Sequence, residues 1–211
     1  MRRSTINHQC HTTSLISYWV GRILLSILGW KVEGEVPPGC KFVLVGAPHT
    51  SNWDFPIGLA TLYVFRLHVT WVGKDTLFKW PFGGFMRWLG GIGVDRSHPA
   101  GVADHLANRI KDAQSMVLVI TPSGTRGKRE YWKSGFYRIA LAADVPLLCG
   151  ALDYQSKTAR LGLSFKPTGD LKSDMDRIRD YYKDMSAAYP ENATPIRLRE
   201  EDDLPLPNKD S

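Results

Sequence analysis

The chain has 211 residues, of which 43% are hydrophobic and 23% charged, and this balance excludes a disordered chain and fits one globular domain with a hydrophobic core. The formal net charge of +6 indicates an anionic partner such as a phosphate-bearing substrate, a lipid surface or a nucleic acid. Three cysteines without a CxxC pair argue against a disulfide framework or a zinc site and favour a reducing compartment. The sequence has no recognition helix, RNP-type aromatic pair or dense basic stripe, so we expect no nucleic-acid partner.

The first predicted element is an amphipathic helix in the apolar stretch at residues 15–30. This stretch is too short to span a bilayer comfortably, Arg22 interrupts it, and no small-residue cleavage site follows as in a secretory signal. At helical spacing, Gly21 and Arg22 belong to a narrow polar stripe, and the broad face opposite contains Trp19 and Ile23. Such a helix either lies in a membrane interface or packs on its own domain, and the pattern leaves both readings open.

A second apolar segment at residues 77–91 is rich in aromatic side chains. Five aromatics alternate with Lys79 and Arg87 around turn-forming proline and glycine residues. Aromatics interleaved with basic residues suit the boundary of a lipid headgroup layer. They also suit a corner of the core with two cations that extend to solvent. We favour membrane contact for this segment.

The rest of the chain alternates extended apolar segments with segments of helical periodicity. Strands are predicted at residues 42–47, 69–73, 116–121 and 146–152, with an edge strand at 160–165, and helices at 54–66, 99–114, 132–143 and 173–189. This alternation predicts an α/β fold: a mainly parallel central sheet flanked by helices, with functional loops at the carboxyl ends of the strands. We therefore divide the chain into an N-terminal membrane-contacting helix region at 1–30, a main domain at 31–190 and a polar, solvated tail at 191–211.

The best clue to chemistry follows the first buried strand, in the sequence APHTSNWDF at residues 47–55. A strand leaving the sheet places His49 at an edge that a ligand can reach, and Ser51 can cap a helix that begins with Asn52. Asp54 then occupies the third helical position, from which its carboxylate leans back toward His49. A histidine held by a carboxylate is the usual arrangement for a general base. The same spacing also fits a plain helix cap, and the spacing alone does not separate the two interpretations.

A basic, glycine-containing loop, TPSGTRGKRE at residues 121–130, follows a later strand. Its glycines permit a tight backbone while Arg126 and Lys128 concentrate positive charge, which indicates an anion site. The loop is not a Walker A motif because the GxxxxGK[ST] spacing is absent, and Ser123 is not a predicted nucleophile because GxSxG is absent. Arg96, in GGIGVDRS, is a second candidate phosphate ligand, although a single arginine after a strand is more often a surface residue.

In chain order these segments resemble the HxxxxD-type glycerolipid acyltransferase family, typified by bacterial 1-acyl-glycerol-3-phosphate acyltransferase. PHTSNWD resembles the family motif NHxSxxD, GGIGVDR resembles GxIFIDR, PSGTR resembles PEGTR, and VPLLCGA resembles VPIVPV. Between the first two, VGKDTLF resembles a family segment that contains a lysine, here Lys74. The resemblance extends over residues 41 to 151.

The resemblance implies roles for individual residues. His49 would be the general base and Asp54 its partner. The phosphate of the acceptor would be bound by Arg96, Gly124, Thr125 and Arg126. Further candidate substrate contacts are Lys74, Ser123 and Lys128. The family's glutamate in the third motif is Ser123 here, which leaves the identity of the acceptor open, and Pro48 replaces the first-motif asparagine.

The expected function is transfer of a fatty acyl group to the hydroxyl of a lysophospholipid or related glycerolipid, in phospholipid synthesis or remodelling. The co-substrate would be a thioester of coenzyme A or acyl carrier protein, with no bound cofactor and no metal. Residues 31–190 would form the acyltransferase domain of a peripheral, monotopic protein on the cytoplasmic side of a cell membrane. The alternatives are a thioesterase, an acyltransferase with a non-phosphate acceptor, or a non-catalytic lipid-binding protein of the membrane surface.

Two finer expectations concern the chemistry and the acyl chain. Backbone amides near the helix start or at Gly124 are candidates for stabilising the oxyanion. Thr61, Leu62 and the aromatics of residues 77–88 are candidates for lining an apolar tunnel.

Overall fold

A seven-stranded sheet forms the centre of the molecule. The computed structural model describes residues 12–94 and 99–202. Its strands are β1 (Lys31–Gly34), β2 (Lys41–Gly46), β3 (Val69–Lys74), β4 (Gly91–Val94), β5 (Met116–Ile120), β6 (Leu147–Asp153) and β7 (Thr158–Phe165). Their order in the sheet is β1-β7-β6-β2-β5-β3-β4, and all neighbours are parallel except β6 and β7. The predicted α/β fold with a mainly parallel sheet is confirmed, with β1 and β4 as strands that the sequence pattern had not predicted.

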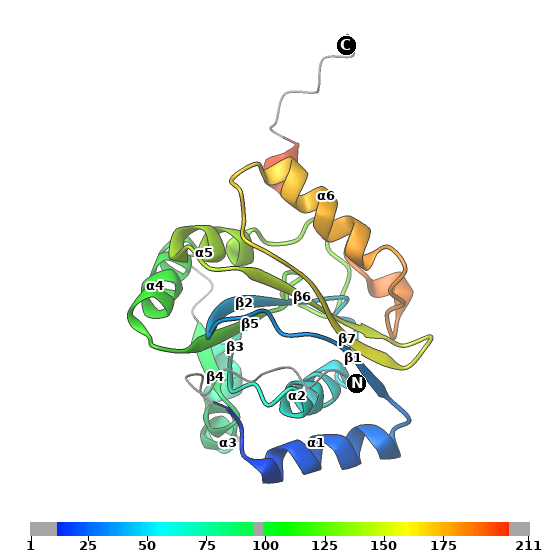
Figure 1. Cartoon of the computed structure of the whole chain (residues 1–211). Coiled ribbons are helices and arrows are strands. Elements are labelled where there is room, and N and C mark those ends of the chain that lie inside the picture. Colours follow the sequence, from blue (N-terminus) through cyan, green and yellow to red (C-terminus); the bar gives the residue numbers. More distant parts are fainter. Residues whose placement is uncertain (1–11, 95–98, 203–211) are drawn as a thin grey trace.

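Helices cover both faces of this sheet (Figure 1). They are α1 (Leu15–Ile27), α2 (Asp54–Val64), α3 (Gly83–Trp88), α4 (Pro99–Asp112), α5 (Gly135–Ala143) and α6 (Leu171–Tyr182). Short 3₁₀ turns lie at Asp75–Phe78, Pro190–Asn192 and Arg199–Glu201. The core on one face of the sheet is shared with α4, α5 and α6, and the core on the other face with α1 and α2. The molecule therefore has three layers.

β2 lies in the middle of the sheet and is buried on both faces. Val43 and Val45 belong to the core that contacts α4, α5 and α6. Phe42 and Leu44 belong to the opposite core, together with Leu62 of α2. A strand buried on both faces is apolar at successive positions, which explains why its sequence pattern predicted it well. This burial fixes the place where β2 ends and where the loop to α2 begins.

α1 packs on α2 through a face that the sequence pattern had predicted to be polar. The buried residues of α1 are Gly21 and Leu25, and a Cβ atom at Gly21 would lie 2.5 Å from the carbonyl oxygen of Ala60. The glycine thus permits close approach of the two helices. Of the predicted apolar face, Leu24 and Trp30 pack into the core with α2. The rest of that face is exposed, at Leu15, Ile16, Trp19, Ile23 and Ile27. Within the described ranges no helix is long and apolar enough to cross a membrane.

The C-terminal part differs from the prediction at both ends of α6. The carboxylate of Asp170 accepts a hydrogen bond from the Ser173 amide at 3.0 Å, so Asp170 is the N-cap in place of Ser173. The helix ends at Tyr182 and not at residue 189. Residues from 191 onward were expected to be solvated, yet Leu198 is fully buried and forms a β-bridge with Trp132. The described part of this segment is therefore attached to the domain.

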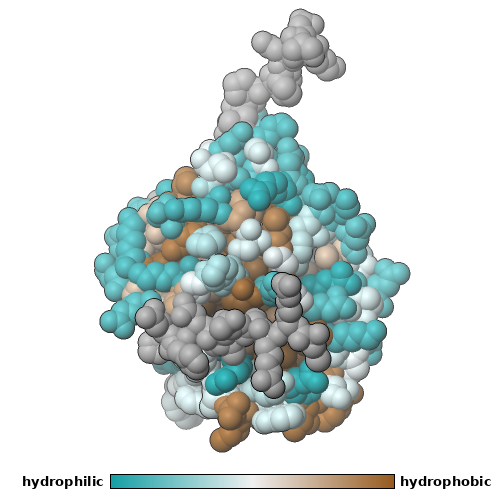
Figure 2. Space-filling model, viewed as in Figure 1, coloured by the Kyte–Doolittle hydropathy of each residue, from teal (hydrophilic) through white to brown (hydrophobic). Residues whose placement is uncertain are grey.

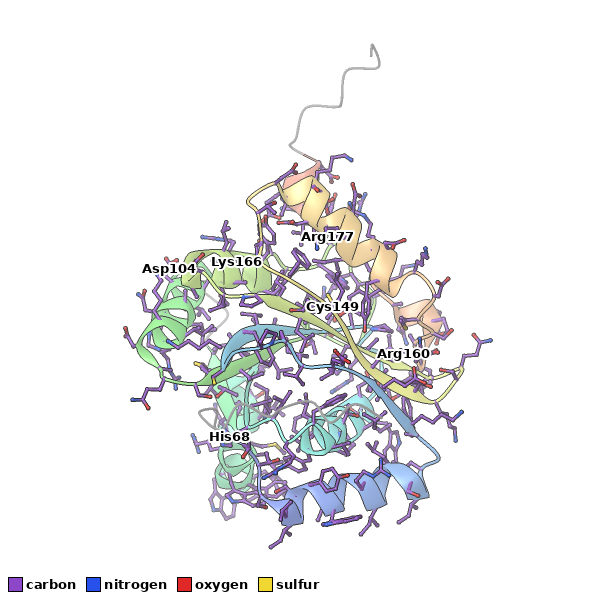
Figure 3. The ribbon with its side chains drawn as sticks, viewed as in Figure 1. His68, Asp104, Cys149, Arg160, Lys166 and Arg177 are labelled. Atoms are coloured by element: carbon purple, nitrogen blue, oxygen red, sulfur yellow. The ribbon has the colours of Figure 1, made fainter. Side chains whose placement is uncertain are left out.

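The cysteines follow the prediction only in part. Cys149 of β6 is free and buried in the core between the sheet and α6 (Figure 3). Burial raises the pKa of its thiol to about 12, which makes it an unreactive core residue. Cys40, by contrast, is disulfide-bonded, which disagrees with the reducing compartment that the cysteine pattern favoured.

Two neighbouring tyrosines of α6 allow a matched test of this core. The Tyr182 hydroxyl is buried and donates to the carbonyl oxygens of Val45, at 2.7 Å, and Gly150, at 3.2 Å. The Tyr181 hydroxyl is also buried but has no hydrogen-bond partner among the described residues. Tyr182→Phe should therefore lower the free energy of unfolding by about 1–3 kcal/mol, whereas Tyr181→Phe should leave it unchanged or raise it. Urea unfolding followed by circular dichroism measures the stability of both variants. Equal losses of stability would contradict the difference in hydrogen bonding between the two hydroxyls.

Candidate active site

His49 and Asp54 form a hydrogen-bonded pair where β2 gives way to α2. Nδ1 of His49 lies 3.0 Å from Oδ2 of Asp54. The side chains are 19% and 7% exposed, respectively. They meet because β2 ends at Gly46 and the following loop folds over the N-terminus of α2, where a negative charge is also favoured by the helix dipole. The predicted pairing of the two side chains is confirmed, and their roles in catalysis remain predictions.

Four hydrogen bonds hold the Asp54 carboxylate. In addition to His49, the amides of Thr50 and Ser51 donate to Oδ2 at 2.8 and 2.9 Å, and the Tyr154 hydroxyl donates to Oδ1 at 2.6 Å. Burial by itself raises the pKa of this carboxyl, but the hydrogen bonds from His49, Tyr154 and Ser51 outweigh burial and hold the pKa below its ordinary value. Asp54 is therefore ionised at neutral pH.

The ionised carboxylate determines which ring nitrogen of His49 carries the proton. A carboxylate can only accept hydrogen bonds, so Nδ1 is the protonated nitrogen and donates to Asp54. In the neutral imidazole, Nε2 then keeps its lone pair. This is the tautomer required of a general base that uses Nε2.

The start of α2 differs from the predicted cap. The helix begins at Asp54, its N-cap Trp53 makes no side-chain capping bond, and the Ser51 hydroxyl oxygen accepts from the Trp53 amide at 3.1 Å. The helix predicted at residues 54–66 thus begins where expected, whereas the alternative start at Asn52 with Ser51 as its cap is wrong. Asp54 nevertheless reaches back to the loop amides, as a capping carboxylate does. Asp54 also bonds to His49 and to Tyr154, and a helix cap requires neither of these bonds.

A cavity of about 640 Å³ lies between the sheet and α2, and His49 lines it. Its wall is mostly apolar and is built by α2 and the strands, including Leu44, Leu59, Leu62, Val69, Trp71, Val119 and Leu161. Of the residues expected to line a tunnel, Thr61, Leu62 and Leu77 do so. The expected aromatics do not line it, because Phe78 is buried away from the cavity and Trp80, Phe82, Phe85 and Trp88 are exposed on the surface. A cavity of this size and composition suits a flexible apolar ligand.

The predicted anion loop contributes to the same cavity. Gly124, Thr125 and Arg126 line it together with His49, so the structure brings two motifs together that are far apart in the chain. Gly124 has a φ of 64°, a left-handed conformation that glycine adopts without strain. Its amide donates to the Thr121 carbonyl oxygen at 3.0 Å.

Three of the amides near the positions expected to stabilise an oxyanion already donate hydrogen bonds. Those of Thr50 and Ser51 donate to Asp54, and that of Gly124 donates within its own loop. The structure thus gives no support to an oxyanion role for these amides.

The remaining candidate residues occupy different places. Lys74 ends β3 and lines the cavity. Ser123 is buried, and its hydroxyl donates to the Thr125 carbonyl oxygen at 2.9 Å, so it shapes the loop. Lys128 is exposed and does not line the cavity, and Arg96 lies outside the described residues. The described part of the chain contains no group of three or more His, Cys, Asp or Glu side chains that could hold a metal ion.

Tyr154 is the site residue that sequence reasoning missed. It lies 100 positions from Asp54 in the chain, in the turn between β6 and β7, and no motif marks it. The one available signal was its position just beyond the carboxyl end of a predicted strand, at the edge of the sheet where functional loops gather.

A comparison with protein families shows to which family the chain belongs. The model of a family described as Acyltransferase matches residues 30–152, which is more than half of the chain. The chain belongs to this acyltransferase family. The matched range includes His49, Asp54 and the 124–126 loop, and the predicted family membership is confirmed.

Among solved structures, the chain is similar to the crystal structure of the 1-acyl-sn-glycerophosphate (LPA) acyltransferase PlsC from Thermotoga maritima. The sequence identity is 17% and the TM-score 0.55, over 82% of this chain and 80% of that chain. At this identity the likeness bears on the fold alone, and it agrees with the α/β architecture. A comparison with curated protein sequences found no match.

The four bonds on Asp54 predict a pH-dependent contribution to stability. The pKa of Asp54 in the folded protein lies below the ordinary value of about 3.9, so the ionised carboxylate stabilises the fold above that pH. The contribution is lost as the pH falls toward the folded pKa. Asp54→Asn should therefore lower the free energy of unfolding by about 1–3 kcal/mol at neutral pH and by less below about pH 4. Urea unfolding of the wild type and of Asp54→Asn across this pH range checks the prediction. A difference in their unfolding free energy that did not change with pH would refute it.

Proposed function

We propose that this acyltransferase moves a fatty acyl group from an acyl thioester to the hydroxyl of a lysophospholipid or related glycerolipid, in phospholipid synthesis or remodelling. The observation that carries the proposal is that the His49–Asp54 pair and the 124–126 loop line one cavity with largely apolar walls. The walls suit an acyl chain, Arg126 suits a phosphate, and His49 suits a hydroxyl that must lose its proton.

In the proposed reaction, Nε2 of His49 takes the proton of the acceptor hydroxyl while the hydroxyl oxygen attacks the thioester carbonyl carbon. The carbon–sulfur bond then breaks, the ester forms, and the departing thiolate receives the proton from the imidazolium. Asp54 holds the ring in the required tautomer and stabilises the imidazolium while it exists. The acyl donor is a thioester of coenzyme A or of acyl carrier protein.

The acceptor phosphate is proposed to bind at the 124–126 loop. A guanidinium forms paired hydrogen bonds with a phosphate, and Arg126 is placed on the cavity to do so. Lys74 lines the same cavity and adds a second positive charge. The family resemblance adds Arg96 to this set.

We further propose that the protein acts as a monotopic protein on the cytoplasmic side of a cell membrane. Hydrophobic residues are exposed in places at the lower edge of the molecule in Figure 2, where Figure 1 shows α1. Ile16 of α1 is 77% exposed, and Trp80 and Trp88 are 94% and 77% exposed. Lys79 and Arg87 lie among these aromatics, and the net charge of +6 favours an anionic leaflet. Such an exposed apolar surface is typical of a membrane or protein contact.

His49→Ala tests the catalytic proposal. Loss of the general base should lower kcat by about a hundredfold to ten-thousandfold without unfolding the domain. The measurement is transfer of a labelled acyl group from acyl-CoA or acyl carrier protein to a series of lysophospholipids, with thermal unfolding as the folding check. His105→Ala, an exposed histidine on α4, is the matched control and should retain activity.

The other outcomes of this assay are equally informative. Transfer by His49→Ala at the wild-type rate would refute the mechanism. Release of free fatty acid by the wild-type protein without an acceptor would identify a thioesterase. Vesicle binding without turnover of any donor would identify a non-catalytic lipid-binding protein.

Substitutions in α1 test the membrane proposal. Each exposed aliphatic side chain that enters the lipid contributes about 1.5–3 kcal/mol, so Ile16→Ser with Ile23→Ser should weaken binding to anionic phospholipid vesicles at least about tenfold. Leu141→Ser is the control, because Leu141 is 45% exposed but lies on α5, which covers the other face of the sheet. Co-sedimentation with vesicles measures binding. If the α1 variant bound like the wild type, this face would not be the docking surface.

A further inference from the structure

The Asp54 carboxylate is held differently at its two oxygens. Oδ2 accepts all the bonds that come from the neighbouring loop, those of His49, Thr50 and Ser51. Oδ1 accepts the hydroxyl of Tyr154, which comes from the other half of the chain. A carboxylate bonded at both oxygens cannot rotate about its Cβ–Cγ bond without breaking one of these contacts. The tyrosine bond therefore determines the plane in which Oδ2 meets the imidazole.

Tyr154 is the donor in this bond. Burial, and secondly the hydrogen bond to Asp54, raise the pKa of Tyr154 above its ordinary value, so the hydroxyl keeps its proton at neutral pH. Asp54 is ionised and can only accept. A hydrogen bond to an ionised acceptor is about twice as strong as one between neutral groups.

The position of the Tyr154 hydroxyl is fixed by the rest of the fold. The backbone amide of Tyr154 donates to the Ser186 carbonyl oxygen at 2.9 Å. The Asp153 carboxylate accepts the amides of Gln155 and Ser186 at 3.3 and 3.2 Å, which holds the turn between β6 and β7. The Tyr154 ring also packs edge-on against the Trp30 ring, with their centroids 5.0 Å apart. The hydroxyl is thus presented to Asp54 by a rigid support.

We infer that Tyr154 is a positioning residue of the acyl-transfer site, whose hydroxyl fixes the Asp54 carboxylate so that Oδ2 stays aligned with His49. Tyr154 does not line the cavity, so it acts through Asp54 and not through contact with substrate. The inference rests on the proposed function, in which His49 is the base. It adds a third residue to the pair, from a part of the chain beyond the matched family range.

Tyr154→Phe is the direct test because it keeps the ring against Trp30 and removes only the hydroxyl. We expect kcat to fall about tenfold to a hundredfold, the range for losing a hydrogen bond to a charged group, with KM for donor and acceptor nearly unchanged. The midpoint of the Asp54 titration, followed by NMR of its carboxyl carbon, should move to higher pH because a bond that lowers its pKa is gone. Tyr181→Phe, which removes a hydroxyl without a hydrogen-bond partner among the described residues, should change neither measurement.

A double-mutant cycle separates positioning from a general structural role. If Tyr154 acts through Asp54, then Tyr154→Phe should have no further effect on kcat in an Asp54→Ala background. The same fold-loss in both backgrounds would overturn the inference, as would wild-type kcat in Tyr154→Phe. Should Asp54→Ala fail to fold, the single-variant kcat and the Asp54 titration decide.

The same assays distinguish this inference from the proposed function. A wild-type protein that transfers no acyl group would refute the proposed function itself. An active wild type, an inactive His49→Ala and a fully active Tyr154→Phe would refute the positioning role alone.

Discussion

The buried, ionised carboxylate of Asp54 is the interaction on which the site depends. Removing a charge from water is costly, and the cost is offset here by four hydrogen bonds from two parts of the chain, the loop after β2 and the turn after β6. Two bonds fix the loop after β2, one orients the His49 ring, and one attaches the turn after β6. A single charge at the start of α2 therefore holds His49 in the tautomer with the proton on Nδ1 and connects the loop after β2 to the turn after β6. Because β2 and β6 are neighbours in the sheet, both segments end beside the same carboxylate.

The sheet topology also explains why His49 and the 124–126 loop line the same cavity. β5 is the other neighbour of β2 and runs parallel to it, so the loops that follow these two strands leave the same edge. One loop carries His49 and the other carries residues 124–126. The faces of β2, β3 and β5 then continue from this edge as an apolar wall beneath α2. The polar side chains of His49, Thr125 and Arg126 therefore lie in loops beyond the carboxyl ends of β2 and β5, beside the apolar cavity.

The N-terminal helix connects this site to the exposed apolar surface. α1 contacts α2 through Gly21 and Leu25, while Ile16, Trp19 and Ile23 on its other side are exposed. Just beyond α1, Trp30 packs on Tyr154 and shares a core cluster with Ile57 of α2. The same small core thus supports the surface proposed to bind lipid and the residue proposed to position Asp54.

The central strands and the His49–Asp54 pair could be predicted from the sequence because each depends on local information. A strand buried on both faces is an apolar run, and two residues five positions apart are brought together by one turn. The contact of Tyr154 with Asp54 crosses 100 positions, and it exists only because the order of the strands places β6 beside β2. The packed face of α1 and the burial of Leu198 were also decided by tertiary structure. Hydrophobic periodicity shows which face of a helix is apolar. Whether that face packs against the protein or stays exposed depends on the tertiary structure around it.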